Sequence, residues 1–528
     1  MPFATTRTVS LDGVLGHLID VQADISQGMV ATALVGRPDA SITEARDRCR
    51  AALANSGYSW PSTRRVTILL SPADLPKRGP HFDLAIAVAV LAADKKVPLA
   101  AAARFVMLGE LTLDGRLRAV PGVLPMVMAA RAHGHDHILV PDSQVGEAAM
   151  VPGLTVVGAR SLPQVVAVLR NEPVPEAPPV PPLATSSVLR WRGEGRTDEL
   201  DLVDVHGMTD ARYALEVSAA GGHHVLLSGP KGAGKTTLAE RLPGLLPDLS
   251  VEEALEVSAV HSLAGDLGSR GIDRRPPFRA PHHSATKASL LGGGTGRVHP
   301  GELSRALHGV LFLDEFPLFS ADLIDALRQP LENGEVTIAR GEEVATFPAR
   351  TTMVLAANPC PCGDYSADAR QSRCTCLETR RRQYRAKVTG PVTDRIDITR
   401  HLTPVQPYEH RDPLSRPEAS AQVRARVAGA RSRQAARYTG TPWRLNGDVP
   451  GPELALHWPL SQDAQTLLDR QLAGGWLTRR GVVRVHRLAW TVADLHERDR
   501  PGVDETLLAL QLRAGDPLPL EALRTRAS

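Results

Sequence analysis

The fold is decided by the stretch Gly229-Pro230-Lys231-Gly232-Ala233-Gly234-Lys235-Thr236, which is followed by Thr237. Its spacing fits the phosphate-binding pattern G-x-x-x-x-G-K-[ST], so all nine residues are candidate nucleotide-binding residues. The apolar residues 223–228 predict a strand before it, and residues 236–246 predict a helix after it. In such a turn the backbone N–H groups and the helix N-terminus face phosphates. We therefore expect Lys235 to contact the β- and γ-phosphates of ATP and Thr236 to bind Mg²⁺.

A second apolar stretch ends in two carboxylates. Residues 309–313 predict a strand, and Asp314 and Glu315 follow it. In this place Asp314 would hold Mg²⁺ and Glu315 would polarise the attacking water. The next apolar run, 352–357, predicts a strand that ends at Asn358, whose amide would orient this water. The alternation of such strands with helical stretches predicts an α/β domain with a parallel sheet between helices.

The three motifs in this order resemble those of the AAA+ ATPases, in which Asn358 would be sensor 1. AAA+ proteins act as rings in which a neighbouring subunit completes each site, so the resemblance implies self-association. Arg395 resembles the arginine finger that acts in trans and stabilises transition-state charge. A surface ion pair of Arg395 with Asp394 or Asp397 is the alternative interpretation.

A C-terminal helix predicted at 481–498 is preceded by two arginines. Arg480 resembles the AAA+ sensor 2 arginine, and we prefer it to Arg479 and Arg484. The predicted helices 422–437 and 462–472 come before it, so we expect the chain to end in an α-helical region.

Longer segments carry a finer resemblance. They are FRAPHHSATKASLLGGG (278–294), HPGELSRALHGVLFLDEF (299–316), LRQPLENGEVTIAR (327–340), ANPCPCGD (357–364), GPVTDRID (390–397) and RGVVRVHRLAWTVADL (480–495). With these segments the chain resembles the YifB/ComM family of magnesium-chelatase-like ATPases. The resemblance implies a hexameric ring and two pore-facing insertions, one at 281–294 and a hairpin at 335–347. Lys287 and Arg340 are the candidate cations of these insertions that would contact DNA phosphates. His282 and His283 fit an ordinary polar turn as well as they fit a pore-facing insertion.

A proline-rich stretch divides the chain. Residues 171–182 carry six prolines, and such a sequence forms neither a helix nor a central strand. We place an N-terminal α+β domain at 1–170, the linker at 171–190 and the AAA+ core at 191–405. The C-terminal helical lid, which resembles the magnesium-chelatase type, follows at 406–528.

The N-terminal domain resembles the Lon protease domain. His81 occupies the position of the serine nucleophile, and Leu124 that of the catalytic lysine. A serine–lysine dyad needs both groups, so we expect an inactive protease domain. We interpret it as a binding or assembly module whose protein partner is unknown.

Four cysteines lie close together in the sequence, and they are Cys360, Cys362, Cys374 and Cys376. Clustered thiols of this kind favour a metal over a disulfide, and four thiolates suit tetrahedral Zn²⁺. Only one residue separates the two cysteines of each pair, whereas two to four residues separate the thiols of usual zinc knuckles. Four free thiols are therefore the alternative.

Composition and charge exclude several classes of protein. With 43% hydrophobic and 23% charged residues, the chain is neither wholly disordered nor collagen-like. The longest apolar run, 84–93, is far shorter than the ~18 residues of a membrane span, and the N-terminus lacks the pattern of a secretory signal. We therefore expect a cytoplasmic protein. The net charge is only +3, so any DNA-binding surface is local. Its candidates are 380–387 and the arginines within 424–437.

The family resemblance favours a motor that binds single-stranded or branched DNA and drives branch migration or unwinding in recombination and natural transformation. One alternative is a protein-remodelling ATPase that holds a polypeptide with the inactive protease domain. The other is a metal-insertion motor like the ATPase subunit of magnesium chelatase. The Lon-like domain and the cysteine pairs fit this last class poorly.

Overall fold

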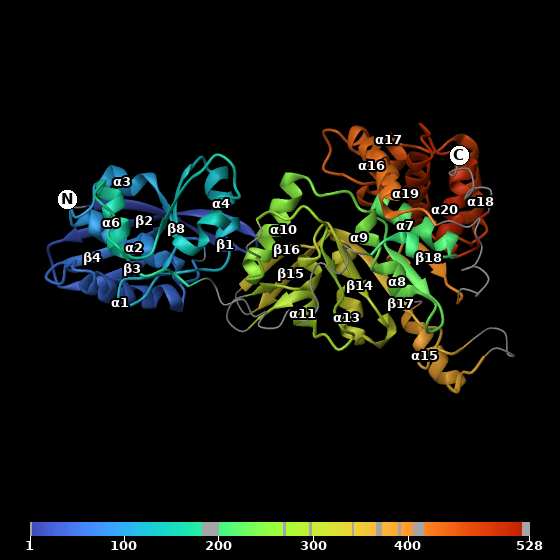
Figure 1. Cartoon of the computed structure of the whole chain (residues 1–528), viewed down its shortest axis with the longest axis horizontal. Coiled ribbons are helices and arrows are strands. Elements are labelled where there is room, and N and C mark those ends of the chain that lie inside the picture. The colour runs from blue at the N-terminus through green and yellow to red at the C-terminus, as the bar shows by residue number, and fades with distance from the viewer. Residues whose placement is uncertain are drawn as a thin grey trace.

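The computed structural model describes residues 3–75, 77–181, 200–267, 271–294, 298–340, 343–365, 372–388, 392–404 and 417–519. The N-terminal sheet lies at one end of an elongated molecule, the P-loop domain lies in the middle, and the C-terminal helices cover the far side (Figure 1). None of the helices in the described part of the chain combines the length and the apolar character that crossing a bilayer requires.

The N-terminal region is a mixed sheet packed against helices. Its strands, in the order in which they pair, are β3 (Ala31–Val35), β4 (Arg65–Ser71), β2 (Leu15–Ser26), β1 (Phe3–Asp12), β5 (Val106–Met107), β8 (His137–Pro141) and β9 (Thr155–Ala159). A small hairpin, β6 (Glu110–Leu111) and β7 (Leu117–Arg118), lies apart from this sheet. The helices are α1 (Ala40–Asn55), α2 (Asp83–Ala93), α3 (Leu99–Arg104), α4 (Val123–Ala132), α5 (Val145–Ala148) and α6 (Leu162–Arg170). Helix α2 is buried on every side because its residues after Asp83 are all apolar.

The P-loop domain contains a five-stranded sheet in which every pairing is parallel. The strand order is β11 (Phe278–Arg279), β14 (Val310–Leu313), β17 (Thr352–Ala357), β10 (Val225–Ser228) and β18 (Ile398–His401). All residues of β14 and β17 are buried, as expected for a sheet covered on both faces. The predicted parallel α/β sheet is thus confirmed. The carboxyl ends of β10, β14 and β17 meet at one edge, where ligands bind in such folds.

Short helices and two hairpins surround this sheet. The helices are α7 (Thr209–Gly221), α8 (Lys235–Ala239), α9 (Leu242–Leu245), α10 (Val251–Ala264), α11 (Lys287–Leu291), α12 (Glu302–Arg305), α13 (Ala321–Ala326), α14 (Arg328–Asn333) and α15 (Glu378–Val388). The short pair β12 (Gly292–Gly293) and β13 (His299–Pro300) lies beside α11. Strands β15 (Glu335–Arg340) and β16 (Glu343–Pro348) form the hairpin expected at 335–347.

The helix predicted at 236–246 is wrong as one continuous element. Helix α8 ends at Ala239, and α9 begins only at Leu242. Pro243 lies in the first turn of α9, where its missing N–H and fixed φ are tolerated, whereas inside a continuous helix it would break the hydrogen-bond ladder.

The C-terminal region is α-helical, as predicted. Its helices are α16 (Ser420–Arg437), α17 (Gly451–His457), α18 (Gln462–Ala473), α19 (Arg479–Leu495) and α20 (Val503–Ala514). Helix α19 ends three residues before the expected end at Arg498. Its buried face shares one hydrophobic core with the P-loop sheet, since Val485 and Leu488 cluster with Val225 and Leu227.

The N-terminal region contacts the P-loop domain through α10. The Ser262 hydroxyl donates to the Glu147 carboxylate at 2.5 Å, and burial raises the pKa of Glu147. Leu263 forms a small hydrophobic cluster with Ala345 and Phe347 of the β15–β16 hairpin, against which Leu11 packs. This interface therefore joins the N-terminal sheet to the base of the hairpin.

Candidate active site

The P-loop wraps around the amino group of Lys235. Its Nζ donates to the carbonyl oxygens of Gly229 and Pro230 at 2.8 and 2.9 Å and to Asn358 Oδ1 at 2.9 Å. Gly232 and Gly234 have φ values of 79° and 80°, which side-chain-bearing residues rarely adopt. Burial lowers the pKa of Lys235, and the charges of Asp314 and Glu315 oppose this shift. The loop therefore presents one cation at its centre, beside the tip of β17.

The hydroxyl and the carboxylate that were expected to bind Mg²⁺ lie together. Thr236 Oγ1 donates to Asp314 Oδ2 at 3.1 Å. Both groups offer hard oxygen ligands, the type that Mg²⁺ prefers, so the donor set fits this cation. Glu315 has a φ of 51°, and its N–H donates to Asp314 Oδ1 at 2.8 Å. A left-handed conformation is costly for a glutamate and is typical of functional sites.

The first insertion reaches the candidate catalytic carboxylate. His283 Nδ1 lies 3.4 Å from Glu315 Oε2. Its ring packs on His282, with 4.0 Å between the ring centroids. Sequence reasoning left open whether these histidines belong to a functional insertion or to an ordinary polar turn, because no spacing rule relates residue 283 to residue 315.

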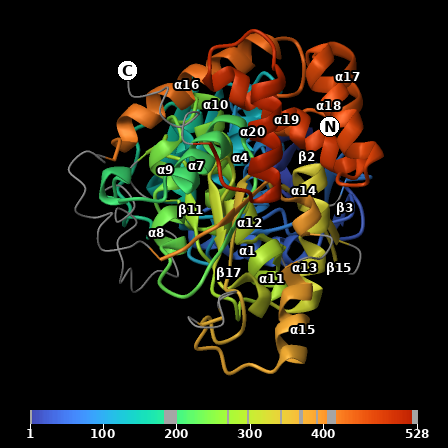
Figure 2. The same ribbon diagram turned by 90° about the vertical axis from the view of Figure 1, so that its right-hand side faces the viewer.

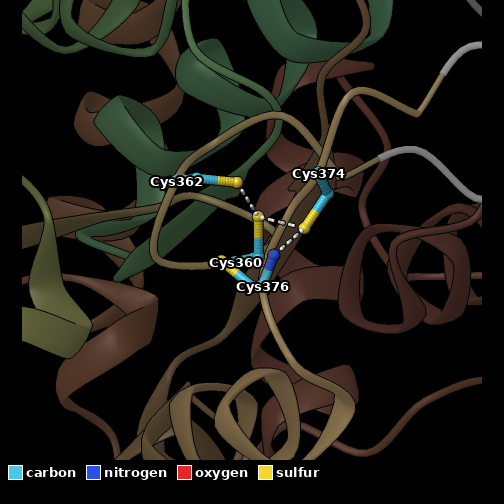
Figure 3. Close-up of side chains that lie close together, drawn as sticks. All are labelled: Cys360, Cys362, Cys374 and Cys376. Carbon is cyan, nitrogen blue, oxygen red and sulfur yellow. Dashed lines mark hydrogen bonds between the residues drawn. The ribbon is translucent and has the colours of Figure 1, made fainter.

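Four thiols gather directly after Asn358. The Sγ atoms of Cys360, Cys362, Cys374 and Cys376 all lie within 4.8 Å of one another. Figure 3 shows them converging from two arms of the loop, with Cys360 Sγ 3.2 Å from Cys362 Sγ and 3.5 Å from Cys374 Sγ. A hydrogen bond from the Asp364 backbone, together with the Cys360 thiol, lowers the pKa of Cys362 to about 6. This cluster has the donors of a tetrahedral thiolate site.

The candidate arginine finger and the candidate sensor 2 arginine meet at one carboxylate on α14. Arg395 Nη2 lies 2.6 Å from Glu332 Oε1, and Arg480 Nη2 lies 4.0 Å from the same oxygen. The Arg395 side chain is 9% exposed and that of Arg480 is 66% exposed. The alternative interpretation expected an ion pair of Arg395 with Asp394 or Asp397. This expected partner is wrong, because Arg395 pairs with Glu332. Figure 2 shows α14, which carries Glu332, well separated from α8, which follows the P-loop.

Arg484 has a different role from Arg480. It pairs with Asp397 at 2.5 Å, and the other carboxylate oxygen of Asp397 accepts the His224 N–H at 3.0 Å. Burial lowers the pKa of His224 to about 4, so this ring stays neutral near pH 7. The charged cluster ties α19 to the start of β10. It is a structural link that the sequence analysis missed.

Comparison with known proteins agrees with this geometry. The family model described as magnesium chelatase, subunit ChlI, matches residues 201–410. A model described as subunit ChlI of Mg-chelatase matches residues 21–144, and one described as subunit ChlI C-terminal matches 417–513. An uncharacterised protein of Mycobacterium tuberculosis is 45% identical over 518 residues, which are 97% of this chain and 99% of that protein.

Two further relatives decide the family. YifB of Escherichia coli is 38% identical over 94% of each chain. The competence protein ComM of Haemophilus influenzae is 37% identical over 92% of each chain. The chain belongs to the YifB/ComM family. It is therefore a magnesium-chelatase-like AAA+ ATPase, for which ATP and Mg²⁺ are the expected nucleotide and cation.

Two residues of the N-terminal region stand where a Lon-type protease has its serine nucleophile and its catalytic lysine. His81 is 2% exposed, and its Nε2 lies 2.7 Å from the Val9 carbonyl oxygen. Leu124 is fully buried in the first turn of α4. The side chain at the nucleophile position is thus committed to a structural contact, and the absence of protease activity stays a prediction.

The two basic groups differ in how their charges are used. All five arginines expected to face phosphates on α16 have partners inside the chain. They are Arg424, Arg426, Arg431, Arg433 and Arg437, and their partners are carbonyl oxygens or carboxylates. These contacts attach α16 to the core, and a DNA-binding role for these arginines stays a prediction. On α15, Arg380 and Arg382 are exposed, and Arg382 Nε lies 3.3 Å from the Glu378 carboxylate.

Proposed function

We propose that this protein is an ATP-driven ring motor that binds DNA and drives branch migration or unwinding in recombination. The proposal that the protein hydrolyses ATP rests on five residues that converge at one edge of the parallel sheet. They are Lys235, Thr236, Asp314, Glu315 and Asn358. The DNA half is supported by family membership, and the name of the Haemophilus relative, a competence protein, favours natural transformation.

The roles of the site residues follow from their chemistry. Lys235 neutralises charge on the β- and γ-phosphates, and the P-loop N–H groups position them. Thr236 and Asp314 would hold Mg²⁺, which when bound would neutralise part of the charge that develops during hydrolysis. Glu315 accepts the proton of the attacking water, and the Asn358 amide orients that water. His283 must release Glu315 for this step, so movement of the first insertion would alter turnover.

The arginines support assembly into a hexameric ring. Arg395 and Arg480 share Glu332, so both lie on one face of the subunit. We propose that this face meets the nucleotide of a neighbouring subunit, where Arg395 acts as the finger and Arg480 as sensor 2. A γ-phosphate would offer these guanidinium groups more acceptor oxygens and more negative charge than one half-exposed carboxylate does.

We also propose that the four clustered thiols bind one Zn²⁺ ion per chain. Thiolates are soft ligands that suit Zn²⁺, and sulfur atoms within 4.8 Å of one another match a common coordination centre. Metal analysis of protein purified under reducing, chelator-free conditions tests this. About one zinc per chain is expected, and a metal-free preparation would favour four free thiols.

A protein-remodelling ATPase is the second candidate function. It is favoured by the packing of Leu11, from β1 of the N-terminal sheet, against the cluster that Leu263 forms with Phe347 at the base of the β15–β16 hairpin. A polypeptide held by the N-terminal domain would then lie near an element that moves during the ATP cycle.

The deciding experiment measures ATP turnover with single-stranded, duplex and branched DNA, together with displacement of a strand from a branched substrate. We expect DNA to stimulate ATP turnover, with little sequence preference and weaker binding at higher salt. The reason is that the protein would contact the phosphates, which every DNA sequence carries. Lys287→Ala with Arg340→Ala should keep basal hydrolysis and lose stimulation. The matched control is Arg50→Ala with Lys96→Ala, two exposed cations of the N-terminal region. Active protein that neither binds nor remodels DNA would replace this proposal with protein remodelling.

A further inference from the structure

The segment 359–388, which carries the cysteine cluster and α15, has little hydrophobic core of its own. Among its residues whose burial the structure describes, Cys360, Gly363 and Tyr384 are buried. The described part of the segment therefore buries few side chains, and in small thiolate folds a metal supplies the cross-link that holds one conformation. The four sulfur atoms come from both arms of the loop before α15, so one ion would tie the arms together.

The loop backbone is arranged to support thiolates. Backbone groups of Gly363 and Tyr365 lie beside the Cys360 thiol, and that of Asp364 lies beside the Cys362 thiol. Donors around ligating sulfur atoms orient the ligands and stabilise their charge in metal sites. Cys360 and Cys362 therefore have outer partners as well as thiol neighbours.

This segment is attached to the P-loop. The N–H of Lys231 donates to the Gly363 carbonyl oxygen at 3.3 Å. Gly363 has a φ of 86°, and a Cβ on it would lie 3.3 Å from Lys231 Cβ. Glycine is needed here both for the backbone conformation and for the close approach of the two loops. The cysteine loop thus packs directly on the turn that surrounds the phosphates.

Two more contacts reach the hydrolytic elements. The hydroxyl of the buried Tyr384 lies against the backbone of Asn358, the sensor 1 residue. Lys387 Nζ donates to the carbonyl oxygen of Pro317 at 3.0 Å, just beyond Glu315. Helix α15 therefore bridges the tip of β17 and the turn after β14.

The same helix is fixed to the cysteine loop. The guanidinium groups of Arg381 and Arg385 lie 4.4 and 4.6 Å from the centre of the Tyr365 ring, in cation–π geometry. Arg385 Nε also donates to the Pro359 carbonyl oxygen at 3.4 Å. A displacement of the loop would consequently move α15 and with it Tyr384 and Lys387.

We propose that the four-cysteine site is a positioning centre for ATP hydrolysis, in which bound Zn²⁺ fixes the segment that holds Asn358, the P-loop and the turn after Glu315. This inference rests on the proposed zinc binding. Loss of the ion leaves Lys235 and the P-loop glycines able to bind phosphates, but Asn358 loses its support. Turnover depends on sub-ångström placement of the water and therefore falls much more than nucleotide affinity does.

The first test uses the full chain and Zn²⁺ alone as the probe. Zinc is removed with a zinc-selective chelator, and kcat for ATP with excess Mg²⁺ and the Kd for a fluorescent ATP analogue are measured before and after Zn²⁺ is restored. We expect kcat to fall about tenfold or more and Kd to change by less than about threefold, with recovery on adding Zn²⁺. Cys374→Ser with Cys376→Ser should reproduce the metal-free values. The control is Cys49→Ser, because Cys49 is a buried thiol of the N-terminal region that donates to the Asp83 carbonyl at 3.3 Å.

The second test breaks the connection and keeps the thiols. Tyr384→Phe removes the hydroxyl that contacts Asn358 and retains the ring, so zinc content should stay at the wild-type level while kcat falls. Tyr58→Phe, at a half-buried tyrosine of the N-terminal region, is the matched control. Zinc-loaded and zinc-free protein with the same kcat would overturn the positioning role and leave zinc binding intact. Wild-type protein that binds no zinc would overturn the metal site, and this inference with it.

Discussion

The P-loop site and the arginine pair show two ways in which sequence motifs become a site. At the P-loop, Lys235, Thr236 and Asp314 meet inside one chain, at the spacing that their motifs imply. Arg395 and Arg480 instead meet at Glu332 on α14. The first group is brought together within one chain, and the second group is not part of it. The difference teaches which residues the proposed ring would have to complete across an interface, and the experiments below test this.

The strongest test of this difference changes the site that is complete in one chain. Glu315→Gln should retain ATP binding and lose at least about a hundredfold in turnover, because an amide does not accept the proton of water. Lys235→Ala should lose ATP binding itself. The control is Glu256→Gln, which also removes a carboxylate that contacts a histidine, here His308 at 2.6 Å. Wild-type turnover in Glu315→Gln would remove this residue from the catalytic role.

The next test addresses the interface. Arg395→Ala should bind ATP normally and hydrolyse it on the order of a hundredfold more slowly, since transition-state charge loses one donor. Mixing it with Glu315→Gln subunits should restore part of the activity, because mixed interfaces then contain one intact finger and one intact P-loop site.

Arg444→Ala is the control for that experiment, as it removes another surface ion pair, 2.9 Å from Glu253. Full turnover in purified Arg395→Ala, or mixtures with no more activity than their components, would contradict an interface role for Arg395.

The smallest effect is expected at Glu332. Glu332→Gln frees both arginines from a half-exposed ion pair, which contributes at most about 1 kcal/mol. If the arginines leave Glu332 for a neighbouring nucleotide, turnover should stay within about threefold of wild type. Thermal unfolding measured alongside would show a small shift. A loss as large as that of Arg395→Ala would mean that the ion pair within the subunit is what matters.

Most elements of the fold follow from local patterns. The apolar runs at 309–313 and 352–357 predicted strands, and β14 and β17 lie there because buried parallel strands need continuous apolar sequence. The interruption between α8 and α9 could also have been predicted, since Pro243 is incompatible with the interior of a continuous helix. It was missed because the apolar pattern of residues 236–246 was given more weight than the proline.

The sequence by itself determined the nucleotide motif, the parallel sheet and the family. Each of these depends on residues at fixed spacing or on long segments whose sequence is characteristic of the family. Only the tertiary structure decided the partners of single charged or thiol groups. Glu332 was one of 58 acidic residues, and only packing shows which of them lies within reach of Arg395. The same holds for His283 at Glu315 and for the cysteine loop on Lys231. Contacts between residues far apart in the chain follow no local rule, since they depend on how whole elements pack.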